Sequence, residues 1–113
     1  MSLIPILGGI PMAAAVVDAT SVPGSVSFDS NSGFSAVSPE SQGNFKLTLS
    51  RPIATTRMCI LISATAKNAS SKSSPAGSYI IGNSSSFNVI TNDTNGYGDM
   101  DCDFSVAVYA LAP

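Results

Sequence analysis

The stretch CDFSVAVYAL, residues 102–111, decides the fold because apolar side chains recur at every second position along it. A period of two places successive side chains on opposite faces of a β-strand. The other face of this segment begins polar and ends apolar. One face is apolar throughout: Cys102, Phe104, Val106, Val108 and Ala110. The pattern predicts a strand that is central to the core.

Similar short segments precede this stretch, and helical periodicity is almost absent from residue 26 onward. Residues 45–49 alternate between apolar and polar, which is typical of a strand with one solvent-exposed face. Residues 58–66 are apolar on both faces, which favours a central strand. Further strands are expected at residues 26–28, 34–37, 78–81 and 86–91, with all five phenylalanines in the core.

Turn-forming residues separate the predicted strands. Gly82-Asn83-Ser84-Ser85 fits a hairpin connection, and residues 67–77 contain no large apolar side chain, which predicts a surface loop. Residues 92–101 form a turn rich in Gly, Asp and Asn. About seven or eight short strands with turns roughly every ten residues predict an all-β fold. We expect a single β-sandwich, and a jelly roll is one topology that fits.

The first seventeen residues carry no charged side chain. Two prolines forbid a regular helix here, and the first Lys or Arg is Lys46, so neither a signal peptide nor a membrane anchor is expected. The large apolar side chains of this arm need a partner surface: Leu3, Ile4, Ile6, Leu7, Ile10 and Met12. We expect an intermolecular contact, with an edge strand on the same domain as the alternative. Residues 11–17 fit a helical turn or a strand. The predicted division is an arm, 1–17, and a β-sandwich domain, 18–113.

Composition excludes several classes of function. Only 11% of the 113 residues are charged, the net charge is −2, and histidine is absent. The chain therefore lacks the commonest proton shuttle and metal ligand, and it has no basic surface for nucleic acid or an anionic membrane. We expect no enzyme activity and no cofactor. Cys59 and Cys102 lie in apolar stretches, which favours buried thiols over a disulfide, and they cannot complete a zinc site.

The acidic segment Asp93–Asp103 is the strongest candidate for metal binding, with four carboxylates in eleven residues. Compared with an EF-hand loop it has Phe104 where a bidentate glutamate is required. Asn95-Gly96 instead fits a hairpin turn with solvated carboxylates. We therefore expect no metal site, and calcium binding is the alternative.

The order of segments from Gly43 onward resembles small β-sandwich modules of tailed-bacteriophage virions. The resemblance covers about seventy residues and consists of strand and turn patterns: GNFKLTLSRPI (43–53), the apolar strand ending at 63–65, SFNVIT (86–91), Asn95-Gly96 and DCDFSVAVY (101–109). Such modules occur at tail-fibre tips and as short stand-alone structural proteins. The resemblance implies a virion location after assembly in the host cytoplasm, and it implies no catalytic residues.

Two functions agree with these observations. The first is a non-enzymatic structural component of a phage virion, a capsid decoration or cement protein that binds neighbouring subunits through its arm and β-body. Its partners would be the major capsid protein or tail subunits, and a homo-oligomer, either trimer or dimer, is expected. The second is a tail-fibre or receptor-binding tip whose loops contact a host surface through Lys67, Lys72, Asn95 and Tyr97.

Overall fold

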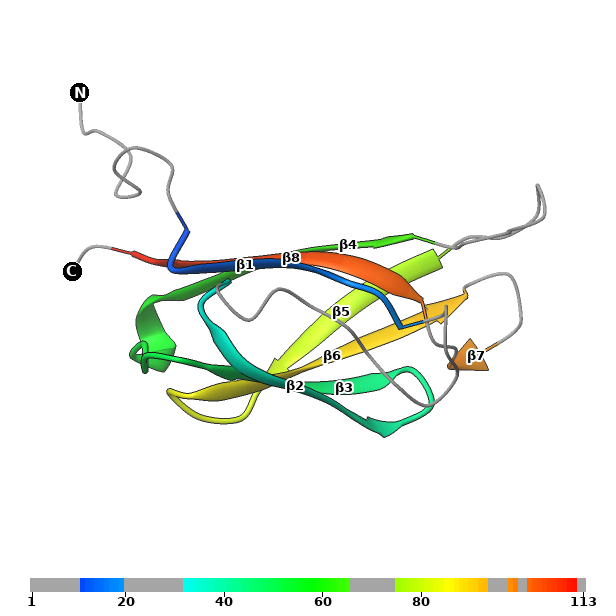
Figure 1. The fold of residues 1–113 in the computed structure, drawn as a ribbon, viewed down its shortest axis with the longest axis horizontal. Helices are drawn as coiled ribbons and strands as arrows, with labels where there is room; N and C mark the ends of the chain where they lie inside the picture. Colours follow the sequence, from blue (N-terminus) through cyan, green and yellow to red (C-terminus); the bar gives the residue numbers. More distant parts are fainter. Residues whose placement is uncertain (1–10, 20–31, 66–74, 94–97, 100–101, 112–113) are drawn as a thin grey trace, which may run out of the picture.

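The protein folds into two antiparallel β-sheets that pack face to face (Figure 1). The computed structural model describes residues 11–19, 32–65, 75–93, 98–99 and 102–111. The three-stranded sheet has the order β1 (Ala13–Val17), β8 (Asp103–Ala110) and β4 (Met58–Thr65). The other sheet has the order β2 (Phe34–Ser41), β3 (Asn44–Leu49), β6 (Ser86–Asp93) and β5 (Pro75–Ile81), and β7 (Gly98–Asp99) also pairs with β6. The predicted all-β sandwich is confirmed.

The core lies between the inner faces of the two sheets. Four phenylalanines are buried there: Phe34, Phe45, Phe87 and Phe104. The Phe45 and Phe104 rings, one from each sheet, lie 5.4 Å apart between centroids. Phe28, the fifth phenylalanine, lies outside the described residues. The strand β8 pairs with both β1 and β4, and Val106 and Val108 on its inner face are at most 3% exposed. The predicted central position of this strand is confirmed.

Residues 13–17 form a strand of the sandwich rather than part of a separate arm. Their strand β1 pairs with β8 along its whole length, from Ala13 opposite Val108 to Val17 opposite Phe104. Ala13 and Val17 belong to the buried core. The strand alternative for residues 11–17 is therefore the observed one, and the sandwich includes five residues that the sequence pattern assigned to the arm.

Gly33 allows β1 to pack closely against the start of β2. Its φ angle is +94°, and a Cβ atom added there would lie 2.5 Å from the Met12 carbonyl oxygen. The adjacent Ser32 carbonyl accepts a hydrogen bond from the Ala14 N–H at 2.9 Å. A residue other than glycine would strain the backbone and push the two strands apart. The two sheets are thus joined along this edge.

Several strand boundaries differ from the sequence prediction. β2 continues through Pro39 to Ser41, and β5 begins at Pro75, inside the predicted loop 67–77. Both strands lie at an end of their sheet's strand order, where a proline can face away from the hydrogen-bonded neighbour. The predicted hairpin at 82–85 is confirmed, and Asn83 Oδ1 accepts the Ser85 N–H at 2.8 Å.

The expectation that residues 58–66 form a central strand is wrong. Within the described residues, β4 is an end strand of its sheet, with β8 as its neighbour. Its inner face is buried through Met58 and Ile60, but Leu61 on its outer face is 56% exposed. An apolar outer face was taken as a sign of burial, although no described element covers it.

Candidate functional site

Within its strands, the outer face of the three-stranded sheet carries one charged side chain, the buried Asp103 at the start of β8. Away from that end the face holds no charge. We call this part the uncharged face, and it consists of Ala14, Val16, Cys59, Leu61, Ser63, Ser105, Ala107 and Tyr109. Strand pairing places these side chains in rows across the sheet. One row joins Leu61, Ala107 and Ala14, and the next joins Ser63, Ser105 and Val16. The face is therefore continuous across all three strands.

Two side chains make the uncharged face unusual for a surface in water. Val16 is 75% exposed and Leu61 is 56% exposed, one on each side of the central strand. Shallow hollows accompany them. The hollow between β4 and β8 has a volume of about 210 Å³, and that between β1 and β8 about 460 Å³. Exposed apolar side chains on one face with hollows between them are typical of surfaces that bind another protein.

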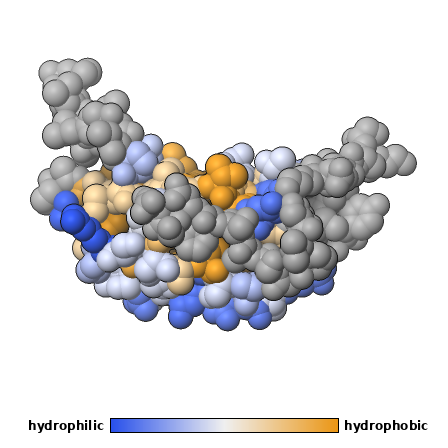
Figure 2. Space-filling view, viewed as in Figure 1, coloured by the Kyte–Doolittle hydropathy of each residue, from blue (hydrophilic) through white to orange (hydrophobic). Residues whose placement is uncertain are grey.

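The outer face of the five-stranded sheet has the opposite character. We call it the polar face, and it includes Ser38, Asn44, Lys46, Thr48, Ile80 and Asn88. The Asn88 Nδ2 donates a hydrogen bond to Asn44 Oδ1 at 2.8 Å, and Lys46 is exposed. Ile80 is the exception, because it is 63% exposed among polar neighbours. Figure 2 shows blue residues along the lower edge, where Figure 1 places β2 and β3.

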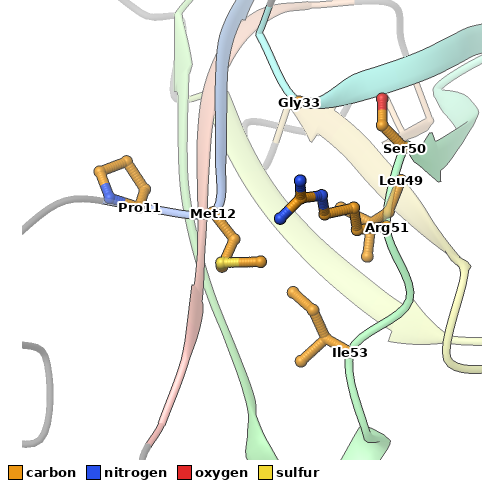
Figure 3. A pocket seen from close by; sticks show the side chains of 7 residues that line it. All are labelled: Pro11, Met12, Gly33, Leu49, Ser50, Arg51 and Ile53. Atoms are coloured by element: carbon orange, nitrogen blue, oxygen red, sulfur yellow. The ribbon is translucent and has the colours of Figure 1, made fainter.

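A cavity of about 230 Å³ lies at the end of the sandwich where β1 begins. Its apolar wall includes Met12, Leu49 and Ile53, and Arg51 supplies its charged side chain. Figure 3 shows the Arg51 guanidinium extending from its loop toward Met12, with Ile53 beside it. Two backbone hydrogen bonds hold this loop: the Ser50 N–H donates to the Gly33 carbonyl at 2.9 Å, and the Ile53 N–H donates to the Ser84 carbonyl at 2.8 Å. The cavity thus combines an apolar wall with one cation on a fixed loop.

Most of the residues predicted to bind partners lie outside the described part of the chain. These are Leu3, Ile4, Ile6, Leu7 and Ile10 of the arm, and Lys67, Lys72, Asn95 and Tyr97 of the loops. Met12, the last of the predicted arm residues, is 44% exposed and lines the cavity. Its N–H donates to the Val108 carbonyl at 2.7 Å, so Met12 is held at the end of the three-stranded sheet.

Sequence reasoning missed Val16, Leu61 and Arg51. The apolar side chains on both faces of residues 58–64 were the available signal, because such a segment is either a covered strand or an exposed binding surface. Nothing in the sequence distinguishes the two without the strand order. Arg51 gave no signal, because its surroundings come from segments distant in the chain.

The acidic segment is only partly described. β7 pairs with the end of β6, and residues 94–97 and 100–101 lie outside the described part. Asp103 is buried, and its Oδ1 accepts the Ala19 N–H at 2.9 Å, so this carboxylate serves the fold. Among the described residues, no three His, Cys, Asp or Glu side chains are grouped as a metal site would need.

The two cysteines are thiols rather than a disulfide pair. Cys102 is buried as expected, whereas Cys59 is half-buried on the uncharged face.

Searches against protein-family models, curated proteins and solved structures gave no match to this chain. In the part of the chain that the structure describes, no helix has the length and apolarity to cross a membrane.

Proposed function

We propose that this protein is a non-enzymatic structural subunit of a phage virion, a capsid decoration or cement protein that binds neighbouring subunits. The uncharged face is the observation that carries the proposal. Val16 and Leu61 are exposed on a sheet whose outer face holds no charge apart from the buried Asp103 at one end, whereas the polar face keeps the other side of the molecule soluble. A partner that covers the uncharged face would remove this apolar surface from water.

The free energies of burial and of association favour a multivalent assembly over a tight complex of two molecules. Burying the exposed parts of Val16 and Leu61 would contribute about 1–2 kcal/mol each. Association itself costs about 4–15 kcal/mol in lost freedom of motion. Two such side chains therefore cannot hold an isolated complex together. Many copies on one lattice, each adding contacts from its arm, overcome this cost through avidity.

The proposal is tested by measuring where the chain is found. Virions that encode it are purified, and its copy number relative to the major capsid protein is measured by quantitative mass spectrometry. We expect hundreds of copies per particle. A few copies would favour the tail-tip function, and absence from particles would overturn the virion role.

A matched pair of variants tests the surface itself. Leu61→Asp places a charge on the uncharged face. Ile80→Asp places the same charge on the polar face, at a residue that is exposed to a similar extent. We expect Leu61→Asp to abolish incorporation into particles while Ile80→Asp is incorporated normally. Equal incorporation of the two variants would show that the uncharged face is not the binding surface.

A further inference from the structure

Arg51 and Glu40 lie at opposite ends of β3 on the same sheet. The strand β3 runs from Asn44 to Leu49, with Glu40 in the hairpin before it and Arg51 in the loop after it. Six residues span about 20 Å at roughly 3.4 Å each, so the two charges are too far apart to pair within one chain. Both side chains are exposed.

Glu40 lies in β2 next to the tip of the β2–β3 hairpin, at a β-bulge. Pro39 pairs with Phe45 and Ser41 pairs with Asn44, so Glu40 has no residue opposite it. A bulge of this kind bends the strand and turns the extra side chain outward. Pro39 beside it is also exposed. The hairpin tip therefore presents an apolar ring next to a carboxylate.

The cavity that follows β3 offers an apolar wall and a positive charge, which complement the apolar ring and the carboxylate of the hairpin. Met12 and Ile53 form its apolar wall, and Arg51 provides the cation. A volume of about 230 Å³ is enough for a small side chain. Because its loop is anchored at Ser50 and Ile53, only the Arg51 side chain, and not its backbone, has to be ordered when a ligand binds.

Three of the other described charged residues have different surroundings. Arg57 Nε donates to the Leu111 carbonyl at 2.6 Å, and Asp103 Oδ1 accepts the Ala19 N–H. Lys46 lies within the polar face, away from either end of β3. On a chain with only 11% charged residues, a single complementary pair has a large influence on how two copies orient.

We propose that the hairpin tip of one copy, Pro39-Glu40, docks into the Arg51 cavity of a second copy of this chain. The Glu40 carboxylate pairs with the Arg51 guanidinium, and Pro39 packs against Met12 and Ile53. This contact rests on the proposed role of the chain as an assembling subunit, and it identifies how two copies meet. Because donor and acceptor surfaces differ, the contact is head-to-tail and produces a ring or an open row.

The test is a charge exchange in the full-length protein, followed by sedimentation equilibrium. Glu40→Arg and Arg51→Glu should each raise the Kd of self-association by at least about tenfold, because each places like charges together. The double variant should recover most of the wild-type affinity. Lys46→Glu, an exposed charge change on the middle of β3, is the control and should leave the Kd unchanged.

Each contrary outcome overturns the proposal. A wild-type protein that stays monomeric at millimolar concentration, or a double variant that does not recover, excludes the pairing. Loss of association in Arg51→Glu but not in Glu40→Arg means that Arg51 contacts a group other than Glu40 on the second copy. Leu61→Asp distinguishes this contact from the proposed function, because it should prevent incorporation into particles and leave head-to-tail association intact.

Discussion

The uncharged face and the polar face are outer surfaces of two sheets that bury similar inner surfaces. Each sheet contributes phenylalanines and branched aliphatic residues to one shared core. Outside, one sheet exposes Val16 and Leu61, whereas the other exposes Lys46 and Ser38, with Ile80 as its exposed apolar exception. Folding therefore accounts for both inner faces and for the polar face, but it leaves the uncharged face unexplained. The proposed role in assembly would account for that face.

The largest expected effect concerns the core that the two sheets share. Phe104→Ala in β8 and Phe45→Ala in β3 should each lower the free energy of unfolding by about 3–5 kcal/mol, because each removes a buried ring from the same pair. A small domain has only about 5–15 kcal/mol to lose. Urea denaturation measures both values. If one variant loses much less free energy of unfolding than the other, the two sheets do not contribute equally to the stability of the core.

A smaller effect is expected at the edge that joins the sheets. Gly33→Ala should cost at least about 1–3 kcal/mol, because a non-glycine residue is strained at a φ of +94° and its Cβ would contact the Met12 carbonyl. Gly82→Ala is the control, since its nearest contact would be an ordinary 3.5 Å to the Ser86 carbonyl oxygen. Thermal unfolding compares the two. Equal melting temperatures would mean that β1 can move away from Gly33.

The inner faces could be predicted from the sequence, but the functional surface could not. Alternation along residues 102–111 identified the central strand, because Cys102, Phe104, Val106 and Val108 are all buried. The same rule failed for Leu61: a period of two says which residues share a face, but not whether another layer covers it. Covering depends on strand order, which arises from pairings such as β1 with β8 that join distant parts of the chain. The Arg51 cavity depends on such contacts as well.

Neighbouring residues of β4 sharpen the comparison between inner and outer surfaces. Ile60→Ala, on the inner face, should cost about 2–5 kcal/mol, whereas Leu61→Ser, on the uncharged face, should change the free energy of unfolding by less than about 0.5 kcal/mol. Leu61→Ser should also reduce binding of a hydrophobic dye to the native protein, and Ile80→Ser should reduce it less. A large loss of stability in Leu61→Ser would place this residue in a covered core.

The smallest change, modification of one thiol, tests whether the uncharged face is covered in the assembled state. Cys59 is half-buried beside Tyr109 on that face, and Cys102 is 1% exposed beneath the sheets. In the unassembled native protein, an alkylating reagent should modify Cys59 quickly and Cys102 only after unfolding, because access limits the reaction of a buried thiol. In assembled particles, a partner on the uncharged face should slow the alkylation of Cys59, while Cys102 remains unreactive in both states. Peptide mass spectrometry after timed alkylation measures the two rates separately, and Cys59→Ser identifies the fast component. If Cys59 reacts equally fast before and after assembly, the partner does not cover this part of the face, and the contrast between the two outer surfaces requires another explanation.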